Sequence, residues 1–303
     1  IPWWMPQTGL PEERLYINQA LDANYINEGN LNTDFEKKIS DMVGAKYAIT
    51  STSCTTALFL CLKAYGIGHG DEVIVPDITF IATANAVDMT GATPVLVDVD
   101  KNLLISIEAI KKSITKKTKA IIPVHVTGRA ADMEAIMKIA KEHNLIVIED
   151  AAEAFMSKYK GKYLGTWGNA GCISFSPNKT ITTGQGGIIV TNDEKINEQL
   201  KMLKDQGRPV RGNGGDDIHY IRGYNFKLTN LQAAVGLGQL HYLEERIKRM
   251  REIYSWYQAG LKNLKEVVLY PCNLEGGAVP QWTDAKIERR DELADYLIKN
   301  NID

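Results

Sequence analysis

The sequence lacks the features that mark several classes of protein. Its 303 residues carry 35 Lys and Arg against 37 Asp and Glu, a formal net charge of −2. This balance argues against nucleic acid or a membrane surface as a main partner. No run of about 18 apolar residues is present, so we expect no membrane span. Because the first six residues lack the basic start and apolar core of a secretory signal, we expect a cytoplasmic protein.

Cysteine and histidine are also sparse. The four cysteines, Cys54, Cys61, Cys172 and Cys272, form no Cys-x-x-Cys pair, and the five histidines show no spacing typical of metal ligands. We therefore expect reduced thiols and no metal site. The chain shows no internal repeat.

What the sequence does contain is a repeated alternation of apolar strands and helices. Strands are predicted at residues 47–50, 72–76, 94–98, 120–124 and 145–148, with helices at 53–63, 80–89, 106–113 and 131–143 between them. This alternation predicts an α/β fold with a mainly parallel sheet that is covered on both faces. Ligands of such sheets collect at the carboxyl ends of the strands.

The later part of the chain predicts a second, smaller unit. A helical pattern at 193–203 is followed by a glycine-rich, charged stretch at 207–217, predicted to be a mobile loop. One long helix is predicted over 229–251 and another over 290–299. We predict a large domain at 1–235, with an N-terminal arm, and a linking helix with part of a small C-terminal domain at 236–303.

Lys179 and Asp150 are the most informative residues. Lys179 lies in a small, polar, glycine-rich turn between two apolar runs, and Asp150 ends the strand 146–150. A pyridoxal 5′-phosphate (PLP) site needs such a lysine as its Schiff base and such an acid to keep the pyridine nitrogen protonated. Taken alone, each has a simpler interpretation, because lysines are usually solvated and acids at strand ends often cap the next helix.

Other candidates follow the predicted strand ends. Ser53, Cys54 and Thr55 begin a helix whose amides and hydroxyls could hold a phosphate, although ordinary capping is the commoner role. Phe80 could stack on a cofactor ring, although an aromatic there is more often core. His125 is predicted to be a satisfied interior or cleft histidine. Their order along the chain resembles that of fold-type I PLP enzymes.

Several sequence blocks narrow the resemblance to one family. They cover nearly the whole chain from Pro2 to 279–283, and the most specific are 148–154, 159–162, 165–168, 174–175, 178–184 and 223–230. These blocks resemble the DegT/DnrJ/EryC1/StrS sugar aminotransferases, which aminate nucleotide-linked keto-sugars. Since members of that family continue beyond the point matching residue 303, part of the small domain is expected to lie outside this chain.

The resemblance implies a role for each matching residue. Lys179 would form the Schiff base, Asp150 would hold the pyridinium and Phe80 would stack on the ring. The phosphate would be held by groups around Ser53, Cys54 and Thr55, together with Ser174. Glu153, where the family often has glutamine, would lie near the phenolic oxygen. Asn225 and Lys227 would reach the neighbour's phosphate across a homodimer interface.

The resemblance also implies the reaction. An amino group would pass from L-glutamate, leaving 2-oxoglutarate, to a nucleotide-linked keto-deoxysugar. Residues 159–168 and 178–184 look most like enzymes that act on GDP-linked 4-keto-6-deoxyhexoses. A dTDP- or UDP-linked 3- or 4-keto-sugar is the near alternative. The sequence departs from the family pattern at Thr127, Arg129, 176–177 and Gln185. These departures bear on which sugar is bound more than on the PLP chemistry.

Two alternatives come from other classes. A PLP-binding regulator without turnover would keep the fold, but the intact Lys179 and Asp150 count against it. A desulfurase is disfavoured because Phe80 stands where a histidine would stack, and no nucleophilic cysteine lies in an obvious mobile loop. Relatives that remove a hydroxyl carry histidine at the lysine position, so Lys179 favours transamination.

Overall fold

The centre of the protein is a seven-stranded sheet, seen in a computed structural model that describes residues 6–209 and 218–302. The strands run in the order β1–β9–β8–β5–β4–β2–β3. Their bounds are β1 (Tyr47–Ser51), β2 (Glu72–Pro76), β3 (Thr93–Val97), β4 (Thr118–Ile121), β5 (Ile146–Asp150), β8 (Ala170–Ser174) and β9 (Gly187–Thr191). Strand β9 is antiparallel to both β1 and β8, whereas the pairs from β8 to β3 are parallel. The predicted α/β fold with a mainly parallel sheet is confirmed.

The reversal of β9 follows from the connection before it. Parallel neighbours need a crossover, which is usually a helix, whereas residues 175–186 contain none and return directly to the sheet. Ser174 therefore pairs with Gly187. The turn that carries Lys179 begins and ends at the edge where the parallel strands finish.

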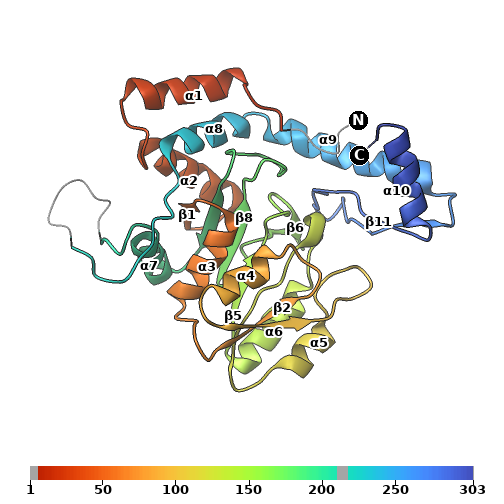
Figure 1. The fold of residues 1–303 in the computed structure, drawn as a ribbon, viewed down its shortest axis with the longest axis horizontal. Helices are drawn as coiled ribbons and strands as arrows, with labels where there is room; N and C mark the ends of the chain where they lie inside the picture. Colours follow the sequence, from red (N-terminus) through yellow and green to blue (C-terminus); the bar gives the residue numbers. More distant parts are fainter. Residues whose placement is uncertain (1–5, 210–217, 303) are drawn as a thin grey trace.

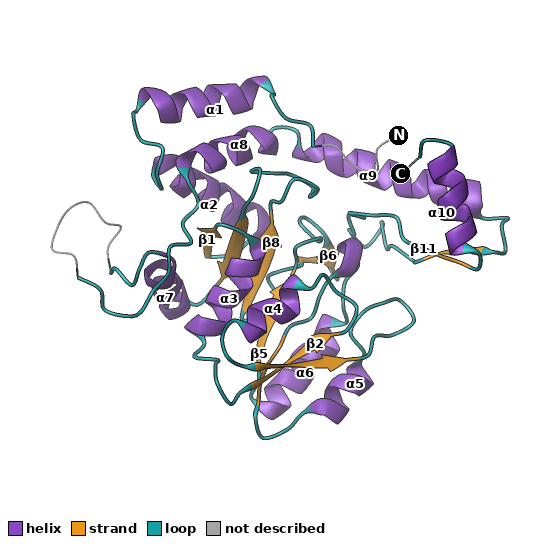
Figure 2. Ribbon diagram, in the orientation of Figure 1, coloured by secondary structure: helices purple, strands orange, loops and turns teal. Residues whose placement is uncertain are grey.

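Helices cover both faces of the sheet (Figure 2). One layer contains α3 (Cys54–Ala64), α4 (Ala82–Asp88) and α7 (Glu194–Lys204), and the other contains α2 (Asn30–Val43), α5 (Ile107–Ser113), α6 (Met133–His143) and α8 (Asn230–Leu240). Neighbouring strand residues alternate between the two cores, because side chains along a strand point to opposite faces. In β2, Ile74 packs in one core while Val73 and Val75 pack in the other.

The single helix predicted over 229–251 is wrong. The chain forms α8 and then α9 (Leu243–Leu261), with a break at His241 and Tyr242. Tyr242 leaves helical geometry at φ −107° and ψ 5°, and its hydroxyl donates to Glu12 in α1 (Pro11–Asp22). Figure 1 shows α8 lying along α1, with α9 continuing toward α10 (Arg290–Lys299). The interruption of the periodic pattern thus coincides with a side-chain contact to a distant helix.

The C-terminal part of the described chain is small and open. Strands β10 (Val267–Leu269) and β11 (Ala285–Ile287) pair antiparallel, and α10 occupies the predicted residues 290–299 without burying any of them. Three short elements lie outside the large sheet. They are the paired strands β6 (Lys158–Tyr159) and β7 (Lys162–Tyr163) and the 3-10 turn η1 (Val126–Gly128). Pro2 and most of the predicted mobile loop, residues 210–217, lie outside the described residues. Within the described residues no helix has the length and apolarity to span a bilayer.

All four cysteines are free thiols, as predicted. Cys61 and Cys172 lie in the core between α3 and β8, with their Sγ atoms 3.7 Å apart. Cys54 is also buried, whereas Cys272 in the C-terminal part is half-buried. Burial raises the pKa of the Cys54 and Cys172 thiols well above the ordinary value, and raises that of Cys272 to about 11.

A buried charge cluster ties the start of the chain to α7. The Nζ atom of Lys204 lies 2.7 Å from Glu28 Oε1 and 3.1 Å from Glu36 Oε1. Burial alone would lower the pKa of Lys204, but the carboxylates of Glu36 and Glu28 outweigh it and raise that pKa. Burial would likewise raise the pKa of Glu36, but Lys204 and Thr50 lower it overall. The attraction between Lys204 and Glu36 therefore favours the charged forms of both groups despite their burial.

We expect Lys204→Met to lower the free energy of unfolding by about 3–5 kcal/mol near pH 8, because it leaves buried carboxylates unpaired. The deficit should shrink as the pH falls toward about 5, since unpaired buried carboxylates can take up protons. Urea unfolding of both proteins across this pH range measures the effect. Lys201→Met, at an exposed position of the same helix, is the control and should change little. An equal loss in the two variants, or a loss independent of pH, would contradict the expectation.

Candidate active site

Predicted site residues at or just after three strand ends meet at one edge of the sheet. Asp150 ends β5, Ser174 ends β8, and Ser53 caps α3 shortly after β1 ends. Gly187 begins β9 at the same edge, and a Cβ atom there would lie 2.5 Å from the amide nitrogen of Cys54. Only glycine allows β9 to approach the start of α3 this closely.

Asp150 is a buried carboxylate with two hydrogen bonds. Its Oδ1 accepts from the Ala152 amide at 3.1 Å, and its Oδ2 accepts from the Thr83 hydroxyl at 2.7 Å. Burial raises the pKa of Asp150, and Glu153 adds to the increase, while Thr83, Ala152 and Lys179 oppose it without cancelling it. The surroundings of Asp150 thus do not fully stabilise its ionised form.

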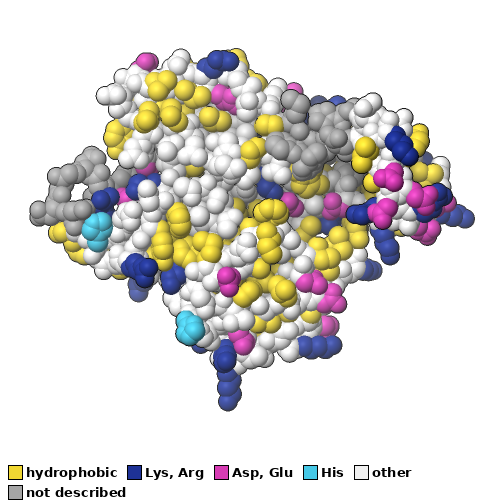
Figure 3. All heavy atoms as spheres, in the orientation of Figure 1, with side chains coloured by type: hydrophobic (Ala, Val, Ile, Leu, Met, Phe, Trp, Pro, Cys, Tyr) yellow, Lys and Arg dark blue, Asp and Glu magenta, His cyan; other side chains and the backbone are white. Residues whose placement is uncertain are grey.

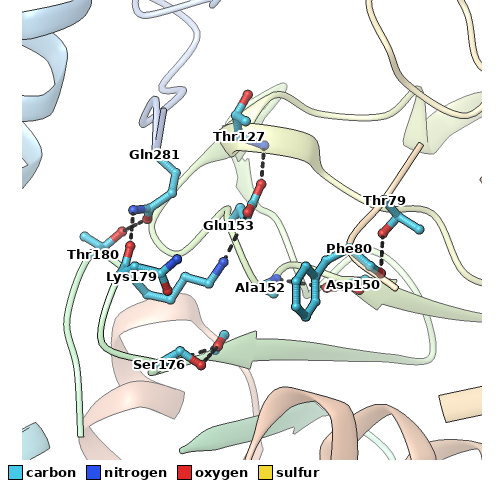
Figure 4. A network of polar contacts seen from close by, with 12 residues as sticks. Thr79, Phe80, Thr127, Asp150, Ala152, Glu153, Ser176, Lys179, Thr180 and Gln281 are labelled. Atoms are coloured by element: carbon cyan, nitrogen blue, oxygen red, sulfur yellow. Dashed lines mark hydrogen bonds and ion pairs between the residues drawn. The ribbon is translucent and has the colours of Figure 1, made fainter. Parts of the chain in front are cut away.

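Lys179 faces a second carboxylate (Figure 4). Its Nζ lies 3.1 Å from Glu153 Oε1, and the other oxygen of Glu153 accepts from the Thr127 amide at 2.9 Å. The lysine side chain is only 13% exposed. This excludes the simple interpretation of a solvated surface charge and places the amine beside Glu153 and within the electrostatic reach of Asp150.

Phe80 is not a core residue, because it is 78% exposed. Its backbone is held next to Asp150: the Thr83 hydroxyl lies 3.3 Å from the Phe80 carbonyl oxygen and 2.7 Å from Asp150 Oδ2. Figure 4 shows the ring on the same side as Lys179 and Asp150. An exposed aromatic face beside a lysine and a carboxylate is free to pack against a planar ligand.

The start of α3 combines capping with free donors. Ser53 is an ordinary N-cap: its Oγ accepts from the Thr56 amide at 3.2 Å, and the Thr56 hydroxyl accepts from the Ser53 amide at 3.0 Å. The amides of Cys54 and Thr55 occupy the first two helical positions, which have no intrahelical acceptor. Because the Cys54 side chain is buried, this residue can offer only its backbone to an anion. Ser174 Oγ, at the end of β8, lies 3.1 Å from Ser176 Oγ.

Glu149 is a residue of the site that the sequence reasoning did not assign. Its fully buried carboxylate accepts from the amides of Gly165 and Gly168 at 2.8 and 2.7 Å, and its Oε2 lies 3.0 Å from His125 Nε2. Since His125 Nδ1 accepts from the Ala131 amide, Nε2 carries the proton and donates it to Glu149. The prediction of a satisfied interior histidine is confirmed. The sequence feature that could have pointed to Glu149 is the block 165–168, since the amides of Gly165 and Gly168 bind its carboxylate.

Asn225 and Lys227 contact a different part of the chain. Lys227 forms an ion pair with Asp205, at the end of α7. Asn225 is exposed, and its backbone forms an isolated bridge with the same aspartate. In one chain they therefore belong to the α7 side of the molecule rather than to the group around Lys179, and their predicted roles stay predictions.

Comparisons with known proteins agree with this geometry. The model of the DegT/DnrJ/EryC1/StrS aminotransferase family matches residues 8–303. The GDP-perosamine synthase of Escherichia coli O157:H7 is 43% identical over 99% of this chain and 83% of its own length. That of Caulobacter vibrioides is 43% identical over 86% of this chain and 70% of its own length. The structure of S. venezuelae DesV in complex with a ketimine intermediate has a TM-score of 0.91 and 34% identity, covering 96% of this chain and 78% of the other.

These likenesses define the class first: the protein is a PLP-dependent sugar aminotransferase with the fold of type I PLP enzymes. It belongs to the DegT/DnrJ/EryC1/StrS aminotransferase family. The predicted fold, family, cofactor and reaction class are thus confirmed. The assignment of roles to individual residues stays a prediction.

We expect Asp150→Asn to make the cofactor-free protein more stable by on the order of 1 kcal/mol at neutral pH, because it removes a buried charge whose folded pKa is raised. An amide can keep both hydrogen bonds, since its oxygen accepts from Ala152 and its NH₂ donates to Thr83. The gain should disappear at pH values low enough to protonate Asp150 in both states. Chemical unfolding from about pH 3 to pH 8 measures it, with exposed Asp295→Asn as control. A less stable variant at neutral pH would contradict the expectation.

Proposed function

We propose that this aminotransferase moves an amino group from L-glutamate to a GDP-linked 4-keto-6-deoxyhexose. The observation that carries the proposal is the 43% identity, over 99% of the chain, to a relative named GDP-perosamine synthase. The second relative of that name has the same identity over 86% of the chain. Glutamate as donor, and 2-oxoglutarate as its product, rest on the family resemblance.

The residues at the strand ends fit PLP. Burial raises the pKa of Asp150 despite the nearby Lys179 charge, and no cation among the described residues forms an ion pair with this carboxylate; the protonated ring nitrogen of PLP would be such a partner. Lys179 offers an amine, and Phe80 an open aromatic face. The amides of Cys54 and Thr55 and the hydroxyls of Ser53 and Ser174 would receive the phosphate at the start of α3. When bound, PLP supplies the electron sink that lets the Cα–H bond of the amino acid break.

Lys179 and Glu153 would divide the remaining work. The Lys179 amine would hold PLP covalently and, once released by the amino acid, would carry the transferred proton on Nζ. Glu153 lies 3.1 Å from that atom and would keep the amine pointed into the site. Its second oxygen is already engaged by the Thr127 amide, so the carboxylate has one preferred orientation.

We also propose that the active unit is a homodimer whose sites are shared. Hydrophobic side chains gather on the face where α3 and α4 lie (Figure 3). Ile78, Phe80 and Ile81, which directly precede α4, are 40–78% exposed, and this suits coverage by a second copy. Asn225 would reach the neighbour's phosphate. Lys227 is engaged by Asp205 in its own chain, which makes Asn225 the better of the two candidates. The division into a large domain at 1–235 and a linking helix with part of a small domain at 236–303 stays a proposal, and its boundary falls inside α8.

We expect the purified enzyme to convert a GDP-linked 4-keto-6-deoxyhexose faster than its dTDP- or UDP-linked 3- or 4-keto counterparts when glutamate is supplied. Formation of 2-oxoglutarate and of the amino-sugar measures the rates. A preference for a dTDP- or UDP-linked sugar would reassign the substrate. Failure even of the half-reaction with glutamate would favour the non-catalytic PLP-binding regulator.

The same assay includes Lys179→Ala, which should lose turnover by at least about 10³-fold because the described residues place no second amine beside Glu153 and Asp150. Sodium borohydride should fix the cofactor to the peptide that contains Lys179 in the native enzyme, as mapped by mass spectrometry. Lys160→Ala, which changes an exposed lysine of a surface ion pair, is the control and should behave as native. A cofactor label on another lysine would overturn the assignment.

Mixing two inactive variants tests the shared site. Lys179→Ala removes the amine, and Asn225→Asp should weaken cofactor retention by placing a negative charge near the neighbour's phosphate. In a mixed dimer one site keeps both native residues, so random exchange should restore about a quarter of native activity. Exchange is followed by native mass spectrometry of differently tagged subunits. Proven exchange without recovery, or a fully active monomer, would refute shared sites.

A further inference from the structure

Residues 278–284, here called the clamp segment, run from the C-terminal part of the chain across the two loops that surround Lys179. The Arg251 guanidinium of α9 donates to the Ala278 carbonyl at 3.2 Å, and the Ser157 hydroxyl accepts from the Val279 amide at 2.8 Å. Gly128 of η1 has φ 90°, and a Cβ atom there would lie 1.9 Å from the Val279 carbonyl oxygen. The segment is therefore pressed against the loop that follows β4.

Gln281 is the residue of the clamp segment that meets the lysine turn. Its Nε2 donates to the Asn178 carbonyl at 3.0 Å, and its Oε1 accepts from the Thr180 hydroxyl at 2.8 Å. The two partners are the residues directly before and after Lys179. The orientation of the amide is determined, because the Asn178 carbonyl can only accept. Gln281 and Thr180 are both buried, so water cannot easily replace these bonds.

The backbone of Gln281 holds the other side of the site. Its amide donates to the Thr127 carbonyl at 3.0 Å, while the Thr127 amide donates to Glu153 and the Thr127 hydroxyl to Asp284. Thr127 has φ 53°, an unusual conformation for a β-branched residue. A strained conformation persists only where its surroundings determine it fully, and here every polar group of Thr127 has a partner.

We propose that Gln281 is a positioning residue for the reactive lysine. It fixes the backbone on both sides of Lys179 with its side chain, and through Thr127 it fixes the carboxylate that faces the lysine amine (Figure 4). One residue from the C-terminal part of the chain thereby positions both the backbone of Lys179 and the Glu153 carboxylate that its amine contacts. The inference rests on the proposed role of Lys179.

The expected kinetic signature follows from this geometry. Gln281 contacts the backbone around the lysine rather than the amine itself, so its loss should slow steps in which Nζ must be placed accurately. Small displacements of catalytic groups lower the turnover rate strongly. The KM for glutamate should change little, because the binding surface for the donor is not removed.

The test compares Gln281→Met, which keeps the length of the side chain without its hydrogen bonds, with Thr180→Val and Thr180→Ser. In steady-state turnover with glutamate and the keto-sugar we expect both Gln281→Met and Thr180→Val to lower kcat about tenfold or more, with the KM for glutamate within about twofold of native. Thr180→Ser keeps the hydroxyl and should retain native kcat. The double variant should be no slower than the slower single variant, because both changes remove the same bond.

A merely structural clamp would behave differently. It would lower the unfolding temperature but leave kcat per folded, cofactor-loaded subunit at the native value, and that result would overturn the proposal. If Gln281→Met does not fold, native kcat in Thr180→Val, or equal losses in Thr180→Val and Thr180→Ser, would overturn it as well. The native enzyme separates the two hypotheses: absence of a borohydride label on Lys179 would refute the proposed function together with this inference, whereas a labelled, active native enzyme with unaffected variants would refute only the latter.

Discussion

The site is organised around one buried carboxylate that water cannot reach. Glu149 is the penultimate residue of β5, the sheet's central strand, and has no exposed surface, so its carboxylate oxygens must be met by protein donors. Three are provided: the imidazole of His125 and the amides of Gly165 and Gly168. These donors lie on two separate loops, which are thereby held at the end of β5. Because neighbouring strand residues point to opposite faces, the same constraint directs Asp150 to the other side of the strand.

Three acids within five residues then differ through their surroundings alone. Glu149 has strong donors on every side and serves structure. Asp150, one residue later, is buried with weaker support, and its pKa is raised. Glu153 lies in the turn after the strand, where it is partly exposed and pairs with Lys179. Differences in burial and in the number of hydrogen-bond donors thus give Glu149, Asp150 and Glu153 three different roles. Other active sites assign acid and base roles to similar side chains through their surroundings in the same way.

Periodic and local features of the chain were predictable from its sequence. The strand and helix pattern indicated the parallel sheet, helix 290–299 was located correctly, and Asp150 and Lys179 were expected at one sheet edge, where the structure places them. Features that depend on distant contacts were not predicted. The break between α8 and α9 involves Tyr242 and Glu12, and the clamp involves Gln281 and Thr180, which are 101 residues apart. No periodicity or short motif carries such information, because it arises only when separate elements pack together.

The four thiols give the molecule its own set of probes for local opening. Cys61 and Cys172 lie face to face between α3 and β8, so a thiol reagent can reach them only when the large core separates. Cys272 lies half-buried in the C-terminal part and needs far less opening. Since raised pKa values keep the thiols of Cys172 and Cys272 protonated, labelling reports exposure more than intrinsic reactivity. The ratio of their labelling rates would therefore separate fluctuations of the C-terminal part from unfolding of the core that carries the active site.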